Sequence, residues 1–389
     1  MPFLRGSLSF ERFRVHGFDA QLFNDEHMER LGNHVAGKVQ TDSEENAHIG
    51  FLGGDHLFDQ HFDLGKNVIN GALHAGVRID TNQVPAAIRN AWLQIELAGL
   101  QKDAANGKIT KAMRQEAKDA VEERCRAEAA TGKYRKMSSA PWLWDPQRET
   151  FYFSGSGPAA AHCADLVERA FDLELHRMSA GSIALDWATE TDRFAEVDDL
   201  IPATFVNGQG VARLPWTNEY SQSPDFLGNE FLLWLWWFLD NENDTIELRD
   251  EGRVTAMFSK SLTLECPLGE NGKETISAEC PVRLPEAMQG VRSGKLPRRA
   301  GLTLARDGMR FDLVLQAESF AIGSAKISSE DDEKLDADDR INAIRFLVET
   351  VDELFISFCQ RRISEQWESD LSAIRTWLEG TNNQGQIAA

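Results

Sequence analysis

Cysteine is scarce in this sequence. There are five among 389 residues, they are scattered, and no two form a Cys-x-x-Cys pair. This scarcity argues against a zinc ribbon and against a disulfide framework.

The most apolar stretch, residues 231–239 (FLLWLWWFL), has nine residues, whereas a membrane-spanning helix needs about 20. The N-terminus also lacks a basic segment leading into an apolar run, which would mark a signal peptide. We therefore expect a reduced, cytoplasmic protein that does not contact a membrane.

Familiar catalytic patterns are missing as well. There is no nucleophile elbow, no paired catalytic His and Cys, and no P-loop lysine. The Gly-rich turn at residues 155–158 lacks the full nucleotide-binding pattern and fits plain helix initiation by Pro158. The acidic run at 330–339 lacks the central Gly and final Glu of a calcium loop, and it better fits the approach to a helix N-terminus. We predict no catalytic residue, no metal and no cofactor.

One segment leaves an enzymatic alternative open. Histidines and aspartates gather between residues 48 and 74, which resembles the composition of a metal site. No spacing among them matches a known ligand pattern, such as two histidines four residues apart on a helix. The alternative is a metal-dependent hydrolase built on these side chains: His48, Asp55, His56, Asp59, His61, Asp63 and His74.

Positive charge is in short supply, but it is concentrated. The chain has 41 Lys and Arg against 62 Asp and Glu, a net charge of -21. Residues 102–136 nevertheless hold ten basic and six acidic side chains, and residues 283–310 hold seven basic and two acidic ones. Two basic segments on an acidic protein can hold a polyanion locally while the remaining surface repels it. The alternative is that both segments are ordinary solvated faces.

The order of expected elements predicts an α+β fold. Apolar content of 42% argues against disorder, and the length suggests two or three domains. Strands are expected at 7–16, 66–80 and 144–154, helices at 25–36, 158–172, 226–240 and 334–379, and an all-β stretch at 245–327 with a hairpin at Asp307-Gly308. The domain boundaries we infer are a central α+β domain at 1–83 and 137–180, a hairpin tip at 84–136, a mostly β domain at 181–327, a helical block at 328–380 and a disordered tail at 381–389.

The Trp-rich segment at 226–240 could in principle be a platform on which nucleic-acid bases stack. Its apolar side chains cover nearly the whole helix circumference, which is typical of a helix buried on most sides. We therefore predict a core helix.

A long αα-hairpin is expected within residues 85–130. Pro85 is tolerated in the first turn of a helix at 85–104, Asn106-Gly107 marks a turn, and Thr110 can cap a second helix. Each helix would be about 30 Å long. On the second helix, three cations at spacing i, i+3 and i+7 share one face that we expect to point to solvent: Lys111, Arg114 and Lys118. The seam against the first helix is expected to consist of Ala112, Met113, Ala117, Ala120 and Val121.

Four stretches, taken in order, carry a resemblance to a known family. They are residues 49–54 (IGFLGG), similar to the family's Gly-Trp-Val-Pro turn; residues 84–136 with the following 143–145; residues 299–327, similar to its Lys-Leu-Ala-Leu strand pair; and the helical block from 346 to 378. On these stretches the chain resembles the recombination-associated protein RdgC family, in its longer form with a Trp-rich insertion.

The resemblance implies a non-enzymatic protein that binds double-stranded DNA without reading its sequence. It implies antiparallel sheets with a protruding long αα-hairpin and a C-terminal helical block. Two such horseshoe-shaped subunits would form a ring-shaped homodimer around the duplex, associated with the nucleoid, that affects recombination and replication and opposes a recombinase filament. Tyr134 stands where the family carries an aromatic at the dimer interface, and Lys260 is similar to a loop-borne family lysine, although Ser261 departs from the family's Gln.

Phosphate contacts by side chains from both basic segments are the mechanism we expect, since such contacts hold a duplex in place without reading bases. The alternative, of another class, is a structural or partner-binding scaffold of the same shape without DNA binding. The predicted DNA-binding residues are Lys111, Arg114, Lys118, Arg135, Lys136, Lys260, Arg298, Arg299, Arg306 and Arg310.

Overall fold

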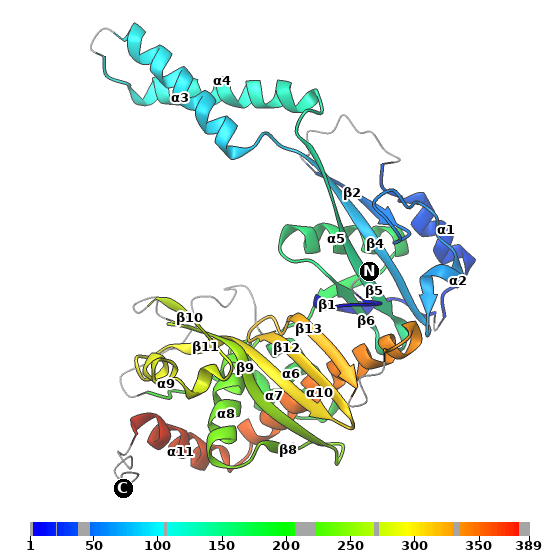
Figure 1. Ribbon diagram of the computed structural model, residues 1–389, viewed down its shortest axis with the longest axis vertical. Coiled ribbons are helices and arrows are strands. Elements are labelled where there is room, and N and C mark those ends of the chain that lie inside the picture. Colours follow the sequence, from blue (N-terminus) through cyan, green and yellow to red (C-terminus); the bar gives the residue numbers. More distant parts are fainter. Residues whose placement is uncertain are drawn as a thin grey trace.

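The computed structural model describes residues 3–20, 22–37, 47–104, 107–206, 223–267, 272–329 and 334–380. Within these residues it is a mixed α+β fold, with one large antiparallel sheet of 13 strands and 11 helices. Figure 1 shows an elongated molecule with a helical projection at one end and a helix-backed sheet at the other. Part of the expected Asn106-Gly107 turn, the acidic residues 330–333 and the tail 381–389 lie outside the described residues.

The central part of the molecule is built on the strands that carry the projection. Their order is β6-β5-β4-β2, with β3 beside β4 and β7 beside β1. The strands are β2 (Ala47–Leu52), β3 (Val68–Ile69), β4 (Ala72–Asn82), β5 (Arg135–Asp145), β6 (Thr150–Phe153) and β7 (Glu174–Arg177), and the helices are α1 (Asp25–Asn33), α2 (Leu64–Asn67) and α5 (Pro158–Phe171).

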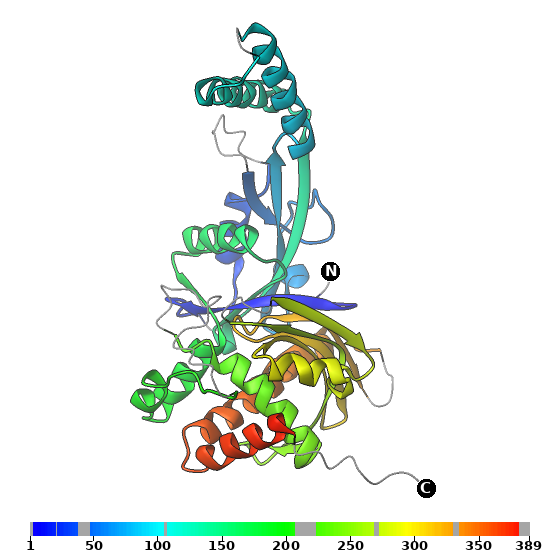
Figure 2. The ribbon, with the colours of Figure 1, turned by 90° about the vertical axis from the view of Figure 1, so that its left-hand side faces the viewer.

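The larger half carries the remaining strands in the order β10-β9-β11-β12-β13, with β8 beside β9. Its helices lie together on one side of the sheet (Figure 2). The strands are β8 (Thr245–Glu247), β9 (Arg253–Glu265), β10 (Lys273–Ala278), β11 (Leu296–Arg306), β12 (Met309–Gln316) and β13 (Ile322–Ser329). The helices are α6 (Ala180–Glu190), α7 (Phe194–Asp198), α8 (Leu227–Asn241), α9 (Pro285–Arg292), α10 (Ala337–Arg362) and α11 (Trp367–Glu379).

Strand β1 (Leu8–His16) joins the two halves. Its first residues pair with β13, and its later residues pair with β6 on one edge and β7 on another. Phe10 belongs to the apolar core of the larger half, whereas Phe13 belongs to the core of the central part. Neighbouring residues of β6 divide in the same way, because Tyr152 faces the larger core while Phe151 and Phe153 face the other. Successive strand side chains point to opposite faces, so one sheet serves both cores.

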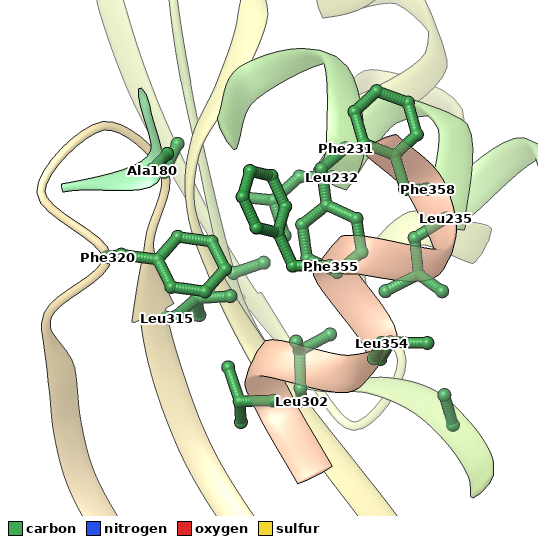
Figure 3. Close-up of a cluster of buried hydrophobic side chains, with 14 of the residues drawn as sticks. Ala180, Phe231, Leu232, Leu235, Leu302, Leu315, Phe320, Leu354, Phe355 and Phe358 are labelled. Carbon is green, nitrogen blue, oxygen red and sulfur yellow. The ribbon is translucent and has the colours of Figure 1, made fainter. Parts of the chain in front are cut away.

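The predicted Trp-rich helix is confirmed as α8, and it is a core element. All its residues from Leu227 to Trp237 are buried. The ring of Phe231 lies 5.4 Å from that of Phe355 and 5.8 Å from that of Phe358, both on α10 (Figure 3). These contacts leave no aromatic face of the helix open for stacking with a nucleic-acid base.

Some local expectations are wrong. The segment expected to be strand-rich at 66–80 begins in a short helix, α2, because the Asp63 side chain caps it by accepting from the Gly65 amide at 2.9 Å. The stretch expected to be all-β contains α9, which starts at Pro285. The helix α6, capped by Ser179, was not anticipated. Within the expected all-β stretch, residues 253–265 form one long strand, β9.

The prediction that the acidic run leads into a helix N-terminus is confirmed for its residues from 334 onwards, which the structure describes. Asp336 is the N-cap of α10, and its side chain accepts from the Asp339 amide at 2.8 Å. Asp338 and Asp339 lie in the first turn, where the helix dipole favours negative charge. In the part of the chain that the structure describes, no helix is both long and apolar enough to cross a membrane.

Truncating the ring at the centre of the larger core should destabilise the fold strongly. Phe231 is fully buried, so Phe231→Ala should lower the free energy of unfolding by about 3–5 kcal/mol. Met257 is 47% exposed, and Met257→Ala should change it by less than about 0.5 kcal/mol. Denaturant titration followed by tryptophan fluorescence measures both values. Similar losses for the two variants would contradict the assigned core.

Candidate nucleic-acid interface

An arm of two helices projects from the free end of the β4–β5 ribbon (Figures 1 and 2). It consists of α3 (Ala86–Asp103) and α4 (Lys111–Ala130), close to the predicted bounds. Pro85 immediately precedes α3, and the Thr110 hydroxyl caps α4 by accepting from the Met113 amide at 3.2 Å. The two helices cross and contact each other (Figure 1). We call this pair of helices the arm.

The seam between the arm helices is narrower than the sequence predicted. Ala117 and Val121 are buried and Met113 is half-buried, but Ala112 and Ala120 are exposed. The packing is extended by Arg124, whose guanidinium lies 4.3 Å from the centre of the Trp92 ring. Such a cation–π contact uses one of the basic side chains of this segment for internal packing.

Three basic side chains follow one exposed edge of α4, which we call the basic edge: Lys111, Arg114 and Lys118. The structure shows no ion pair for any of them with another described residue. Glu122, four residues after Lys118 and therefore on the same side of the helix, instead accepts from Arg126 at 2.8 Å. The basic edge is therefore a set of cations that is not neutralised within the described part of the subunit.

The outward face of α4 has the opposite sign. Glu116, Asp119 and Glu123 line an open depression there, together with Gln115 and two alanines. At 100° per residue this acidic face lies about 140° around the helix from the basic edge. α4 is therefore two-sided, and its basic edge is the side that attracts a polyanion. The sequence prediction of a basic stripe did not anticipate the acidic face beside it.

At the base of the arm the two predicted cations differ in their surroundings. Arg135 is the first residue of β5, and its Nη2 donates to the Asp80 carboxylate at 2.9 Å. Lys136 is exposed and pairs in the sheet with Thr81. Tyr134, the predicted interface aromatic, is half-buried in the preceding turn, with the Lys133 ammonium 5.4 Å from its ring centre.

Most predicted cations of the larger half form ion pairs with acids of the same subunit. Arg298 donates to Glu265 at 2.7 Å, while Arg299 next to it is exposed. Lys260 and Arg310 both lie against Asp312, at 3.0 Å and 3.4 Å. Each of these pairs would have to be exchanged for a phosphate contact before it could contribute to DNA binding.

Asp312 is suited to retain its charge. Burial alone would raise the pKa of this carboxyl group, but hydrogen bonds from Thr303 and Lys260 and the charge of Arg310 together hold the pKa below its ordinary value. The group is therefore an anion at neutral pH, and it competes with any phosphate for the two cations beside it.

Arg306 is not available to a ligand. Its side chain is 5% exposed and ion-paired with Asp250, and its guanidinium lies 4.9 Å from the centre of the Phe346 ring. A buried cation in a strand core needs such partners, because burying it alone would be costly. Arg306 is therefore a structural residue and does not belong to a DNA interface.

Lys260 also differs from its expected setting. It was expected on a loop, but it lies within β9 at a bulge with a left-handed φ of 66°. Ala300 pairs with Leu262 whereas Leu302 pairs with Phe258, so β9 carries extra residues at this point. Gly301 faces the bulge, where a Cβ would lie 2.0 Å from the Ser259 carbonyl oxygen. Bulges of this kind redirect a side chain, and here the ammonium is directed to Asp312.

The His/Asp-rich segment forms a structural network in the described part of the chain. Asp59 is buried, accepts from the Asp55 and His61 amides and pairs with Lys66 at 2.5 Å. His74 is buried on β4, and burial lowers its pKa to about 4. Among the described residues no group of three or more His, Cys, Asp or Glu side chains is arranged to hold a metal ion. The geometry gives the hydrolase alternative no observation in its favour.

The buried imidazole should make stability depend on pH. Since the folded-state pKa of His74 is near 4 and the unfolded one near 6.5, the neutral ring is favoured in the folded protein. The part of the unfolding free energy that comes from the neutral ring is fully present above pH 6.5. It is lost as the pH falls towards 4, and about 2 kcal/mol is lost by pH 5. His74→Phe should abolish this part of the pH dependence, measured as unfolding free energy at pH 7 and pH 5. An equal pH dependence in the variant would contradict the assignment.

Comparison with other proteins adds no family assignment. No protein-family model matches the chain, and no curated protein matches it. The function is therefore argued from the arm, the basic edge and the surrounding charges.

Proposed function

We propose that this protein is a non-enzymatic DNA-binding protein of the RdgC type, which holds double-stranded DNA independently of sequence. One observation carries the proposal: the three cations of the basic edge are exposed, share one side of α4 and have no acidic partner among the described residues. A row of free cations on a projecting helix is suited to phosphate contacts, which position a duplex without reading bases.

The outline of the subunit supports a ring. The arm and the larger half extend to the same side of the central part, so the chain has the form of a horseshoe (Figure 1). Two horseshoes related by a two-fold axis close into a ring through isologous contacts, since each surface meets its own copy. Tyr134 at the base of the arm is the aromatic that we place at one of these contacts, because aromatic side chains are favoured interface anchors.

The charge distribution suits a sleeve around DNA. The net charge of -21 and the acidic face of α4 repel the duplex, whereas the basic edge attracts it, and the difference directs the polyanion to one side of α4. Of the ten predicted DNA-binding residues, five are exposed without an ion pair among the described residues: Lys111, Arg114, Lys118, Lys136 and Arg299. Such a protein on the nucleoid would compete with a recombinase filament for the same duplex.

A second candidate function is a scaffold that binds another protein. It is favoured by the arm's apolar exposure, since Ile95 is 62% exposed and Trp92 is only half-buried. Apolar side chains on a projecting element are typical of protein interfaces. In the ring, a second copy of the chain would cover these apolar side chains. In the scaffold, a different protein would cover them.

Reversing the basic edge should abolish DNA binding. Two arms with three cations each give six phosphate contacts, so wild-type affinity for duplex DNA should fall about 10³-fold between 50 and 200 mM salt. The variant with Lys111, Arg114 and Lys118 all changed to Glu should lose binding at both salt concentrations. Fluorescence anisotropy with duplexes of unrelated sequence measures the affinity.

A matched control separates the basic edge from net charge. Changing Arg5, Arg169 and Lys334 to Glu alters the total charge by the same amount at exposed positions that lie neither on the arm nor on the strands of the sheet. This control should bind with near wild-type affinity, and both variants should unfold within about 1.5 kcal/mol of wild type, at about 0.5 kcal/mol per surface change. A triple arm variant that binds DNA normally would overturn the proposal in favour of the scaffold.

The oligomeric state tests the ring itself. The wild-type protein should sediment as a dimer at micromolar concentration, and Tyr134→Asp should weaken one closing contact without unfolding the subunit. Retention on circular DNA at high salt should then drop while linear DNA still binds. A monomeric wild-type protein would rule out the ring and leave only binding by single arms.

A further inference from the structure

Only two short chain segments connect the arm to the body, residues 83–85 and 131–134. The direction of the arm therefore depends on the contacts at this junction. Since α3 has 18 residues, it is about 27 Å long, and a rotation of about 10° at its base moves the tip by about 5 Å. A set of phosphate contacts on the arm needs a junction that resists such rotation.

The junction is built around one carboxylate. Asp80, on β4, accepts two hydrogen bonds from Arg78, at 2.9 Å from Nε and 3.0 Å from Nη2. It accepts a third from Arg135 Nη2 at 2.9 Å, across the ribbon from the first residue of β5. The Asp80 side chain is 8% exposed and that of Arg78 is 5% exposed, whereas that of Arg135 is 45% exposed.

The surroundings hold this cluster in place. Arg78 also donates to the Leu57 carbonyl at 3.4 Å, and its guanidinium lies 5.9 Å from the centre of the Phe58 ring. Nearby on β4, the side-chain amide of Asn82 donates to the Ala129 carbonyl in the last turn of α4. That carbonyl also accepts from the Gly132 backbone amide at 2.9 Å, just beyond the end of the helix. The end of α4 is therefore tied to the ribbon by Asn82, and the Asp80–Arg135 pair holds the two ribbon strands together where they meet the arm.

We infer that Asp80 is a positioning residue that fixes the direction of the arm, and that Arg135 acts with it as part of this junction instead of contacting phosphate. A bidentate carboxylate–guanidinium pair has a defined geometry as well as a charge. Adding the second arginine extends that geometry from β4 to the strand that continues from α4. The consequence for DNA rests on the proposed function, but the consequence for arm mobility does not.

Electrostatics and positioning predict opposite signs for one substitution. Asp80→Asn removes a negative charge at the base of the arm, so charge alone predicts tighter DNA binding. Loss of the junction predicts weaker binding, because an arm that is correctly oriented for about a tenth of the time lowers the apparent affinity about tenfold. We expect the weaker binding, together with a broader range of arm positions in the absence of DNA.

Arg135→Gln and its neighbour Lys136→Gln form a matched pair. Both remove one positive charge, but Arg135 alone contacts Asp80. Lys136→Gln should leave the arm fixed. It should make the slope of log affinity against log salt concentration shallower by about 1 per subunit. Arg135→Gln should free the arm, and because it retains the Arg78–Asp80 pair it also serves if Asp80→Asn does not fold.

Arm position can be measured on the full-length protein without DNA. Spin labels at Ala98 on α3 and Asp165 on α5, both exposed, give a distance distribution by double electron–electron resonance, with unlabelled subunits in excess and Cys125 and Cys280 changed to Ser. The inference requires a broad distribution for Arg135→Gln and a narrow one for Lys136→Gln. Equal narrow distributions, or tighter DNA binding by Asp80→Asn, would overturn it. Failure of the wild-type protein to bind DNA would overturn the proposed function alone.

Discussion

The structure depends on strand β1 and on the buried ion pair at its centre. Arg12 makes a two-point contact with Asp352 of α10, at 2.6 Å and 2.8 Å, and its side chain is 2% exposed. Burial alone would lower the pKa of Arg12, but Asp352 raises it above its ordinary value, so the guanidinium stays charged. Removing one partner of such a pair typically costs about 3–5 kcal/mol because the other charge is left buried. The pair lies where the strand passes from one core to the other.

Two further ion pairs extend this contact along α10. Arg345 meets Asp145 at 2.6 Å, and Glu349 meets Arg148 at 2.8 Å. With Asp352 these residues lie on one side of α10, since they are spaced by four and three positions. The helix therefore joins the larger half to the end of the ribbon opposite the arm. The relative positions of arm and larger half, on which a ring depends, follow from this polar contact and from the shared strand.

The sequence pattern correctly predicted the elements whose formation depends on residues close in the sequence. The arm helices, their cap at Thr110 and the buried helix α8 follow from turn residues, caps and apolar periodicity. The hairpin at Asp307-Gly308 joins β11 and β12 as expected. Features that depend on distant partners could not be read in this way. The bulge at Lys260 arises because β9 pairs with β11, and nothing within residues 253–265 reveals that partner.

In the candidate site, too, sequence pattern could not predict contacts with residues distant in the sequence. A run of basic residues indicates charge, but its availability depends on which acids the fold brings alongside. Arg306 is neutralised by Asp250, 56 residues away, and Arg135 by Asp80, 55 residues away. Only the basic edge could be anticipated, because its neighbours belong to the same helix. The acidic face beside it was also present in that helix, at Glu116, Asp119 and Glu123, and a helical projection of all the charges would have found it.

Lysine footprinting on the wild-type protein tests the central claim most directly. Acetylation rates with and without duplex DNA compare the basic edge with a distant exposed lysine in one experiment. The account predicts that DNA protects Lys111 and Lys118, while Lys334, exposed just before α10 and in no strand, reacts at an unchanged rate. Equal rates at Lys111 and Lys118 with and without bound duplex would contradict the claim that the arm holds DNA.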